Sequence, residues 1–177
     1  MNTGQKIVLG FGLTFAVYAL SAWVRGKNLI EQGGDIVSGI AKYTQRGLRN
    51  NNAGNIRISA NAWQGKIPVD HNTDGTFEQF ETPEYGIRAL SHLLRNYASK
   101  YGATSVADFV NKYAPPSEND TGSYVDAVAS DMGVDANSNV NLADNNVMVK
   151  MVAAIVRHEN GIQPYDVATI ASGVEMS

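Results

Sequence analysis

The sequence predicts a mainly α-helical fold with one small β-hairpin, preceded by a single N-terminal transmembrane helix. An uncharged apolar run near the N-terminus indicates the transmembrane helix. Apolar residues at three- and four-residue steps, bounded by capping residues, predict helices in the second half. Alternating residues around Thr73-Asp74-Gly75-Thr76 predict the hairpin. Three parts follow from this: an anchor over 1–25, a linker with a short helix over 26–45, and a folded domain over 46–177.

Composition excludes several classes of protein. The 177 residues carry a net charge of −3, so no basic surface for nucleic acid is indicated. There are no cysteines, which removes disulfides, thiolate metal sites and cysteine nucleophiles. The three histidines lack the helical spacing of a zinc site. We therefore expect no cofactor, apart from a calcium ion considered below.

The uncharged run extends from Ile7 to Val24 between basic residues. At about 1.5 Å per residue, this helix would span about 27 Å, close to the thickness of a bilayer core. A secretory signal cleaved near Ala19-Leu20-Ser21 and a buried core helix are the alternatives. We expect a membrane anchor, so a lipid bilayer is a predicted partner through residues 7–24.

Capping signals place three helices in the folded domain. Thr82 followed by Pro83 begins one that runs to about Tyr101. Ser105 and Asp108 form a capping-box pattern for a second, which ends before Pro115-Pro116. Thr121 caps a third, closed by Gly133.

A fourth helix contains the candidate catalytic residue, Glu159. Asp144 can cap its start, Gly161 can end it, and Pro164 prevents continuation. Glu159 follows Met148, Val152 and Ile155 at helical spacing, so it shares their apolar face. An apolar surrounding and the negative end of the helix dipole disfavour the ionised form, as a general acid requires. The alternative is a glutamate satisfied by Arg157, His158 or a loop amide.

Between Gly47 and Asn55 the chain is rich in asparagine and glycine, which is incompatible with a regular helix. We expect a structured loop in which Asn50, Asn52 and Asn55 bind a carbohydrate-like ligand; an ordinary surface turn is the alternative. Trp63 is either a sugar-stacking ring or, more in keeping with its type, a core residue.

The acidic stretch from Asp70 to Glu81 matches the calcium-loop pattern through Asp70, Asn72, Asp74 and Glu81. Prolines on both sides exclude the helices of an EF-hand, so the hairpin is favoured and calcium remains the lesser alternative. Asp70, Asp74 and Glu78 are candidates for a second catalytic carboxylate. Nucleophile-elbow and phosphate-loop motifs are absent from the sequence.

The segment from Ala154 to Tyr165, AIVRHENGIQPY, resembles the catalytic helix of lytic transglycosylases and goose-type lysozymes. This resemblance implies that Glu159 is the catalytic acid and base, with Asn160 in the place of the usual serine. The block from Asn50 to about Tyr101 is similar to bacterial glucosaminidases of the lysozyme superfamily. There the block follows the glutamate helix, whereas here it precedes it, which implies a circularly permuted lysozyme-like α+β domain.

The region from Arg46 to Tyr165 also resembles a family of phage and prophage virion proteins. Its marks are RGLRNNN, YGIRAL, APPSENDT and RHENG. The resemblances together imply a membrane-anchored, virion-associated lytic transglycosylase, located in a virion membrane or the bacterial inner membrane. The implied partners are peptidoglycan strands and other virion proteins. The implied groove residues are Asn50, Asn52, Asn55, Tyr85, Tyr124, Asn160 and Tyr165. The alternative is a non-catalytic virion protein that links membrane, capsid or cell wall.

Overall fold

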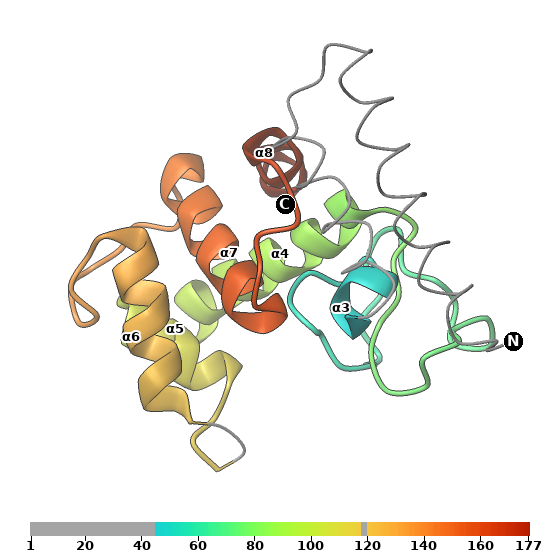
Figure 1. Cartoon of the computed structure of the whole chain (residues 1–177), viewed down its shortest axis with the longest axis horizontal. Coiled ribbons are helices and arrows are strands. Elements are labelled where there is room, and N and C mark those ends of the chain that lie inside the picture. Colours follow the sequence, from blue (N-terminus) through green and yellow to red (C-terminus); the bar gives the residue numbers. More distant parts are fainter. Residues whose placement is uncertain (1–44, 118–119) are drawn as a thin grey trace, which may run out of the picture. The chain divides into compact units, whose positions relative to one another are not determined.

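The computed structural model describes residues 45–117 and 120–177. Six helices lie in this part of the chain and are labelled as in Figure 1. They are α3 (Arg46–Arg49), α4 (Pro83–Tyr101), α5 (Val106–Tyr113), α6 (Thr121–Met132), α7 (Asn145–Asn160) and α8 (Val167–Glu175). Irregular segments between α3 and α4, and between α6 and α7, complete the described chain.

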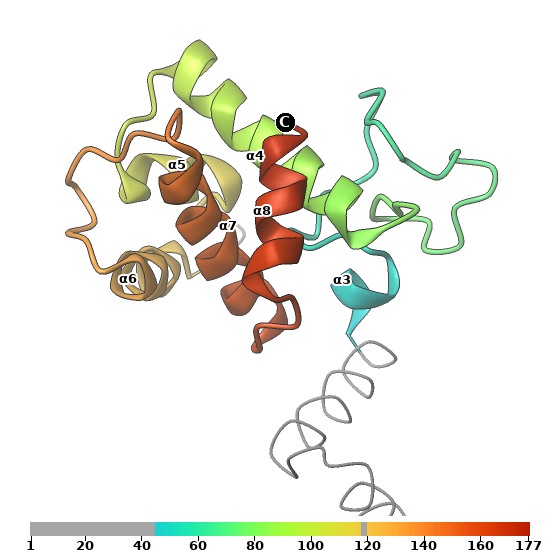
Figure 2. The ribbon, with the colours of Figure 1, turned by 90° about the horizontal axis from the view of Figure 1, so that it is seen from above.

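The core lies where α4, α7 and α8 pack together, with α5 and α6 completing it on one side (Figures 1 and 2). On the opposite side are α3 and the long loop that precedes α4. Ile87, Leu90 and Leu94 of α4 are fully buried, as the predicted periodicity requires. The apolar face of α7 is buried as well, so the last turn of α7 is held rigidly against the rest of the domain.

The capping signals are confirmed. Ser105 and Asp108 form a capping box at the start of α5. Asp144 accepts a hydrogen bond from the backbone N–H of Asn146, and Gly161 ends α7 in the left-handed conformation at φ 67°. Two caps differ from the prediction. Thr82 stands at the N-cap position of α4, but its side chain makes no capping hydrogen bond. Asp120, and not Thr121, caps α6, because its carboxylate accepts from the backbone N–H of Ser123.

The predicted β-hairpin is wrong: the described residues contain no β-strand, only isolated antiparallel bridges. The segment from Phe77 to Phe80 is divided between two partners. Its start pairs with residues 56–58, through Arg57 opposite Phe77, and its end pairs with the segment around Lys66. Because each pairing is only one bridge long, no ladder propagates. The domain is helical with an irregular, hydrogen-bonded loop.

The predicted transmembrane helix is not found among the described residues. None of the helices within 45–117 and 120–177 is long and apolar enough to cross a membrane. The segment to which the prediction referred, residues 7–24, lies outside the described residues, as does nearly all of the expected linker and short helix over 26–45. The predicted fold class is therefore corrected to a helical domain.

The last helix, α8, was not predicted. Asp166 caps it through the backbone N–H of Thr169 at 2.7 Å. Gly173 lies against α4, where a Cβ atom would come within 2.6 Å of the Ile87 side chain. This glycine lets α8 approach α4 closely, and α4 in turn supports the loop that reaches the candidate site.

Candidate carboxylate cleft at the end of α7

Glu159 lies in the last turn of α7 and is partly buried. Each of its carboxylate oxygens accepts one hydrogen bond from a distant part of the chain. The Tyr124 hydroxyl on α6 donates to Oε1 at 2.8 Å, and the Asn55 side-chain amide donates to Oε2 at 2.9 Å. Both of these donors are neutral groups. Of the predicted groove residues, these two are brought to Glu159.

The loop that carries Asn55 is shaped by unusual backbone angles. Asn51 and Asn55 have φ values of 48° and 50°, in the left-handed region that asparagine tolerates better than most residues. Gly47 is required nearby, because a Cβ atom there would lie 2.7 Å from Oδ1 of Asn55 and 2.8 Å from Oδ1 of Asn160. The Asn-rich sequence therefore encodes a backbone that aims Asn55 at α7.

Asn52 and Asn160 hold this loop in place. Asn52 is fully buried, and its amide nitrogen donates to the backbone carbonyl oxygens of Ile56 and Glu78. Its amide oxygen accepts from the backbone N–H of Ile56. Asn160 is buried too, and donates to the carbonyl oxygens of Ala53 and Val156. Their side chains are directed into the protein, so they position Asn55 and Glu159 instead of lining the groove.

Two tyrosines form the wall beside Glu159. The rings of Tyr113 and Tyr124 contact edge to face, with their centroids 6.5 Å apart. The Tyr113 hydroxyl donates to the Gly54 carbonyl. His158 stacks on Tyr124, with ring centroids 3.6 Å apart. Burial raises the pKa of Tyr124, and the neighbouring Tyr113 and Glu159 raise it further. Burial and the Glu159 charge likewise raise the pKa of Tyr113. Both hydroxyls therefore stay protonated and remain donors near neutral pH.

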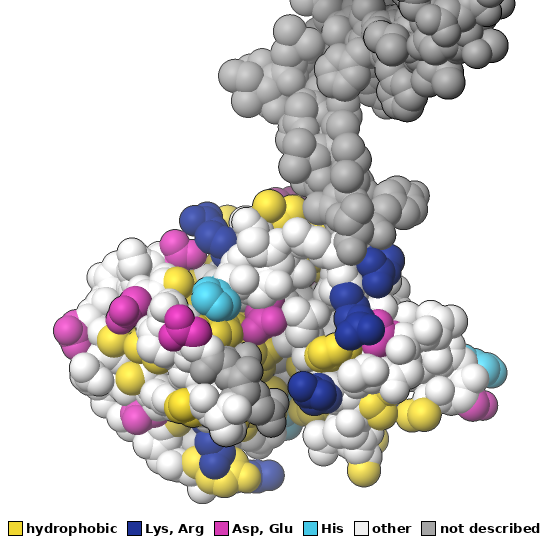
Figure 3. Space-filling model, turned by 60° about the horizontal axis from the view of Figure 1, so that its bottom comes forward, with side chains coloured by type: hydrophobic (Ala, Val, Ile, Leu, Met, Phe, Trp, Pro, Cys, Tyr) yellow, Lys and Arg dark blue, Asp and Glu magenta, His cyan; other side chains and the backbone are white. Residues whose placement is uncertain are grey.

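A cleft of about 650 Å³ opens over Glu159. We call it the Glu159 cleft, and it is lined by Gly54, Asn55, Ile56, Arg57, Phe77, Leu93, Tyr97, Tyr113, Ala114, Pro115 and Glu159. Glu159 is the only carboxylate among these lining residues. In Figure 3 an acidic side chain lies near the centre of this face, between a histidine and a group of Lys and Arg side chains.

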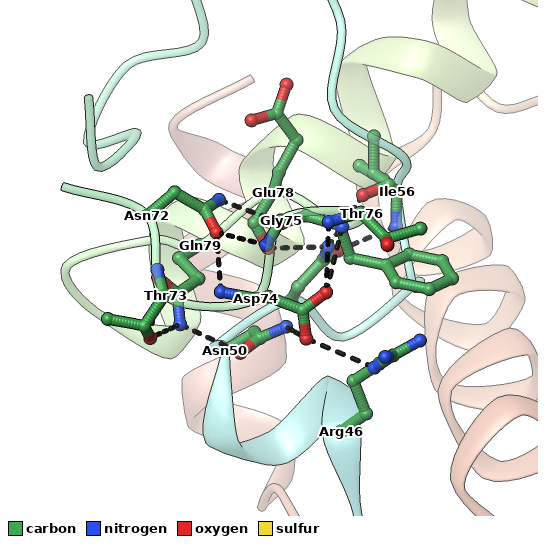
Figure 4. Close-up of polar contacts among 12 residues, drawn as sticks. Arg46, Asn50, Ile56, Asn72, Thr73, Asp74, Gly75, Thr76, Glu78 and Gln79 are labelled. Carbon is green, nitrogen blue, oxygen red and sulfur yellow. Dashed lines mark hydrogen bonds and ion pairs between the residues drawn. The ribbon is translucent and has the colours of Figure 1, made fainter. Parts of the chain in front are cut away.

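Asn50 and Asp74 form a separate cluster beside the end of α3 (Figure 4). The Asn50 amide donates to Asp74 at 2.9 Å, and Arg46 pairs with the same oxygen at 3.1 Å. The other Asp74 oxygen accepts from the backbone N–H groups of Thr76 and Phe77. Burial raises the Asp74 pKa, but the hydrogen bonds and the Arg46 charge outweigh it, so the pKa is lowered overall. This carboxylate braces the loop and does not line the Glu159 cleft.

Glu78, another candidate carboxylate, is fully buried. Its Oε1 pairs with Lys66 at 2.9 Å and accepts from the backbone N–H of Ser59 at 3.0 Å. In Figure 4 its side chain points away from the Asp74 cluster. The third candidate, Asp70, is exposed, with its carboxylate 3.9 Å from His71. The structure therefore brings none of the three to Glu159.

The calcium pattern corresponds to a loop that is already hydrogen-bonded to itself. The Asn72 Oδ1 accepts from the backbone N–H groups of Asp74 and Gly75, and both Asp74 oxygens are occupied as described. Asp70 and Glu81 are exposed. Within residues 45–117 and 120–177, no three acidic or histidine side chains cluster closely enough to hold a metal ion.

Tyr85 and Tyr165, also predicted for the groove, are half-buried elsewhere. The Tyr85 ring covers Gly65, where a Cβ atom would lie 2.2 Å from it. Burial, together with the Glu84 charge, raises the Tyr165 pKa to about 12. Sequence reasoning missed Arg57, Tyr97 and Tyr113 in the cleft. Tyr97 continues the apolar spacing of Leu90 and Leu94 on α4, which indicates a core position, and Tyr113 precedes Pro115-Pro116 without any motif of its own.

The geometry defines a class of protein: a small helical domain with one carboxylate fixed by neutral donors in an aromatic cleft. No protein family model matches the chain. It is 39% identical over 133 residues to protein P5 of Pseudoalteromonas phage PM2, an alignment that covers 73% of this chain and 80% of the phage protein. The chain therefore belongs to the family of this phage protein. The predicted membership of a phage protein family is confirmed, whereas the relative's name states neither a fold nor an activity.

Proposed function

We propose that this protein is a component of a bacteriophage virion whose folded domain binds glycan strands of the bacterial cell wall. The observation that carries the proposal is the Glu159 carboxylate, held by Tyr124 and Asn55 at the base of an aromatic cleft. Kinship with a phage protein supports the placement in a virion.

The lining of the cleft suits a sugar polymer. Phe77, Tyr97 and Tyr113 supply aromatic surface, on which the apolar faces of sugar rings can pack. The Asn55 amide and the Glu159 carboxylate are hydrogen-bonded to each other. When a sugar binds, both groups can instead form hydrogen bonds with its hydroxyl or N-acetyl groups. The cleft therefore combines aromatic surface with a few convergent polar groups, as small-ligand sites do.

Cleavage of the strand is the second candidate function, supported by Glu159 being the only carboxylate among the described residues that line the cleft. Hydrolysis normally requires two carboxylates. In the single-carboxylate reaction, Glu159 would give its proton to the glycosidic oxygen as the bond to the sugar carbon breaks. It would then take the proton of the muramic 6-hydroxyl as that oxygen bonds to the same carbon. The products are a new sugar hydroxyl and a 1,6-anhydro end.

The test uses the full-length protein and purified peptidoglycan sacculi. We expect wild type to sediment with the sacculi and Glu159→Gln to bind about tenfold more weakly, as the loss of a charged hydrogen-bonding group implies. Glu175→Gln, an exposed change on α8, is the matched control and should bind as wild type does. Absence of wild-type binding would overturn the proposal.

Mass spectrometry of the soluble fraction separates binding from cleavage. Fragments with anhydro ends that appear with wild type and not with Glu159→Gln would establish the transglycosylase reaction. Fragments with reducing ends would instead indicate hydrolysis. Sedimentation without released fragments would leave a binding protein with no catalysis.

A further inference from the structure

A second pocket adjoins the Glu159 cleft. We call it the Trp63 pocket; its volume is about 480 Å³, and Leu93 and Tyr97 line both hollows. Its other lining residues are Asn61, Ala62, Trp63, Arg88, His92, Asn96, Lys100 and Tyr101. Because the two hollows share a wall, a ligand longer than one sugar can occupy both.

Helix α4 forms the shared wall through two parallel ridges. Leu93, Tyr97 and Tyr101 recur at four-residue steps and make an apolar ridge. Arg88, His92, Asn96 and Lys100 recur at the same step and make a polar ridge beside it. Trp63, from the loop before α4, contacts His92 edge to face at 6.0 Å and faces the polar ridge. The pocket is therefore walled by aromatic rings and cationic side chains.

The two hollows differ in charge. Among the described residues, one arginine and one glutamate line the Glu159 cleft, whereas Arg88, Lys100 and no carboxylate line the Trp63 pocket. Lys112 lies 3.7 Å from the centre of the Tyr101 ring and adds a further positive charge at its edge. The Glu159 cleft, where the charges of Arg57 and Glu159 balance, is suited to neutral sugar, and the basic Trp63 pocket is suited to an anion that also has apolar groups.

We propose that the Trp63 pocket binds the carboxylate-bearing peptide stems attached to the glycan strand. This inference rests on the proposed glycan binding and names the second part of the same ligand. A stem begins at a sugar and carries free carboxylates along short apolar side chains. Its carboxylates would pair with Lys100 and Arg88, while its methyl groups would pack on Trp63 and Tyr101.

The test compares two forms of one polymer, intact sacculi and sacculi whose stems have been removed by an amidase. We expect the full-length wild type to bind the intact form about tenfold more tightly, with the greater salt sensitivity that charge pairing gives. Lys100→Glu should abolish this preference and leave binding to the stripped form unchanged. Lys150→Glu, an equally exposed change on α7 outside both hollows, is the control and should keep the preference.

Equal binding of both forms by wild type would overturn the stem inference and leave the proposed glycan binding intact. The same holds if Lys100→Glu and Lys150→Glu bind the intact form equally well. Failure of wild type to bind either form would overturn the proposed function and the stem inference together.

Discussion

The end of α7 and the loop before α4 both contain carboxylates that are buried or partly buried, but these carboxylates have different partners. In the loop, Glu78 is sealed from solvent and paired with Lys66, and Asp74 is paired with Arg46 and Asn50. At the end of α7, Glu159 has two neutral donors and opens onto a cleft. A buried carboxylate that is paired with a cation destabilises the fold when that cation is removed. A carboxylate whose donors are neutral and exchangeable can instead bind a ligand. The difference separates structural acids from a candidate functional one.

The largest expected effect comes from breaking the sealed pair. Lys66→Met leaves the Glu78 carboxylate buried without its cation, which typically costs about 3–5 kcal/mol of folding free energy. Urea unfolding followed by circular dichroism measures this loss, and Lys150→Met serves as the exposed control. Adding Glu78→Gln to Lys66→Met should recover part of the stability, since no charge then remains buried. A loss no greater than that of the control would remove the distinction drawn between the two regions.

A smaller effect is expected at Asp74. Its pKa is lower in the folded state than its ordinary value of 3.8, so the ionised side chain stabilises the fold above that pH. This contribution is lost as the pH falls below 3.8 and through the lowered folded pKa. Asp74→Asn should cost about 1–2 kcal/mol at pH 7. The stabilities of wild type and variant, measured from pH 7 to pH 2, should converge in acid. Parallel curves would show that Asp74 is not a structural anion.

The smallest effect on stability is expected at the candidate site. Glu159→Gln retains one oxygen acceptor and removes a negative charge from the C-terminal end of α7, so the change should be about 1 kcal/mol or less. Tyr124→Phe removes one hydrogen bond and should cost a similar amount. Thermal unfolding measures both, and each variant should bind peptidoglycan more weakly despite being folded. A loss at Glu159→Gln as large as that at Lys66→Met would place Glu159 among the structural acids.

Local signals in the sequence were sufficient for most of the helices. The boundaries of α4, α5 and α7 follow from capping residues, prolines and glycines within a few positions of each end. The hairpin prediction failed because Phe77 and Phe80 pair with different segments, and alternation within one stretch cannot show which partner it meets. The short helix α8 was missed, and its place against α4 depends on the contact between Gly173 and Ile87.

At the candidate site, too, local sequence signals predicted one part and long-range contacts decided the other. Helical spacing was enough to put Glu159 on the apolar face of α7, because that spacing is a property of the helix itself. Only the tertiary structure decided that Asn55, 104 positions away, and Tyr124, 35 positions away, bond its two oxygens. Likewise, the sequence marked Glu159 as the candidate acid and Asp70, Asp74 and Glu78 as candidates for a second carboxylate. Only the folded chain shows that Asp74 and Glu78 are paired with cations, that Asp70 is exposed and that Glu159 lines a cleft. Whether a charged side chain is paired, buried or accessible depends on residues far away in the sequence. These residues come into contact only in the folded protein.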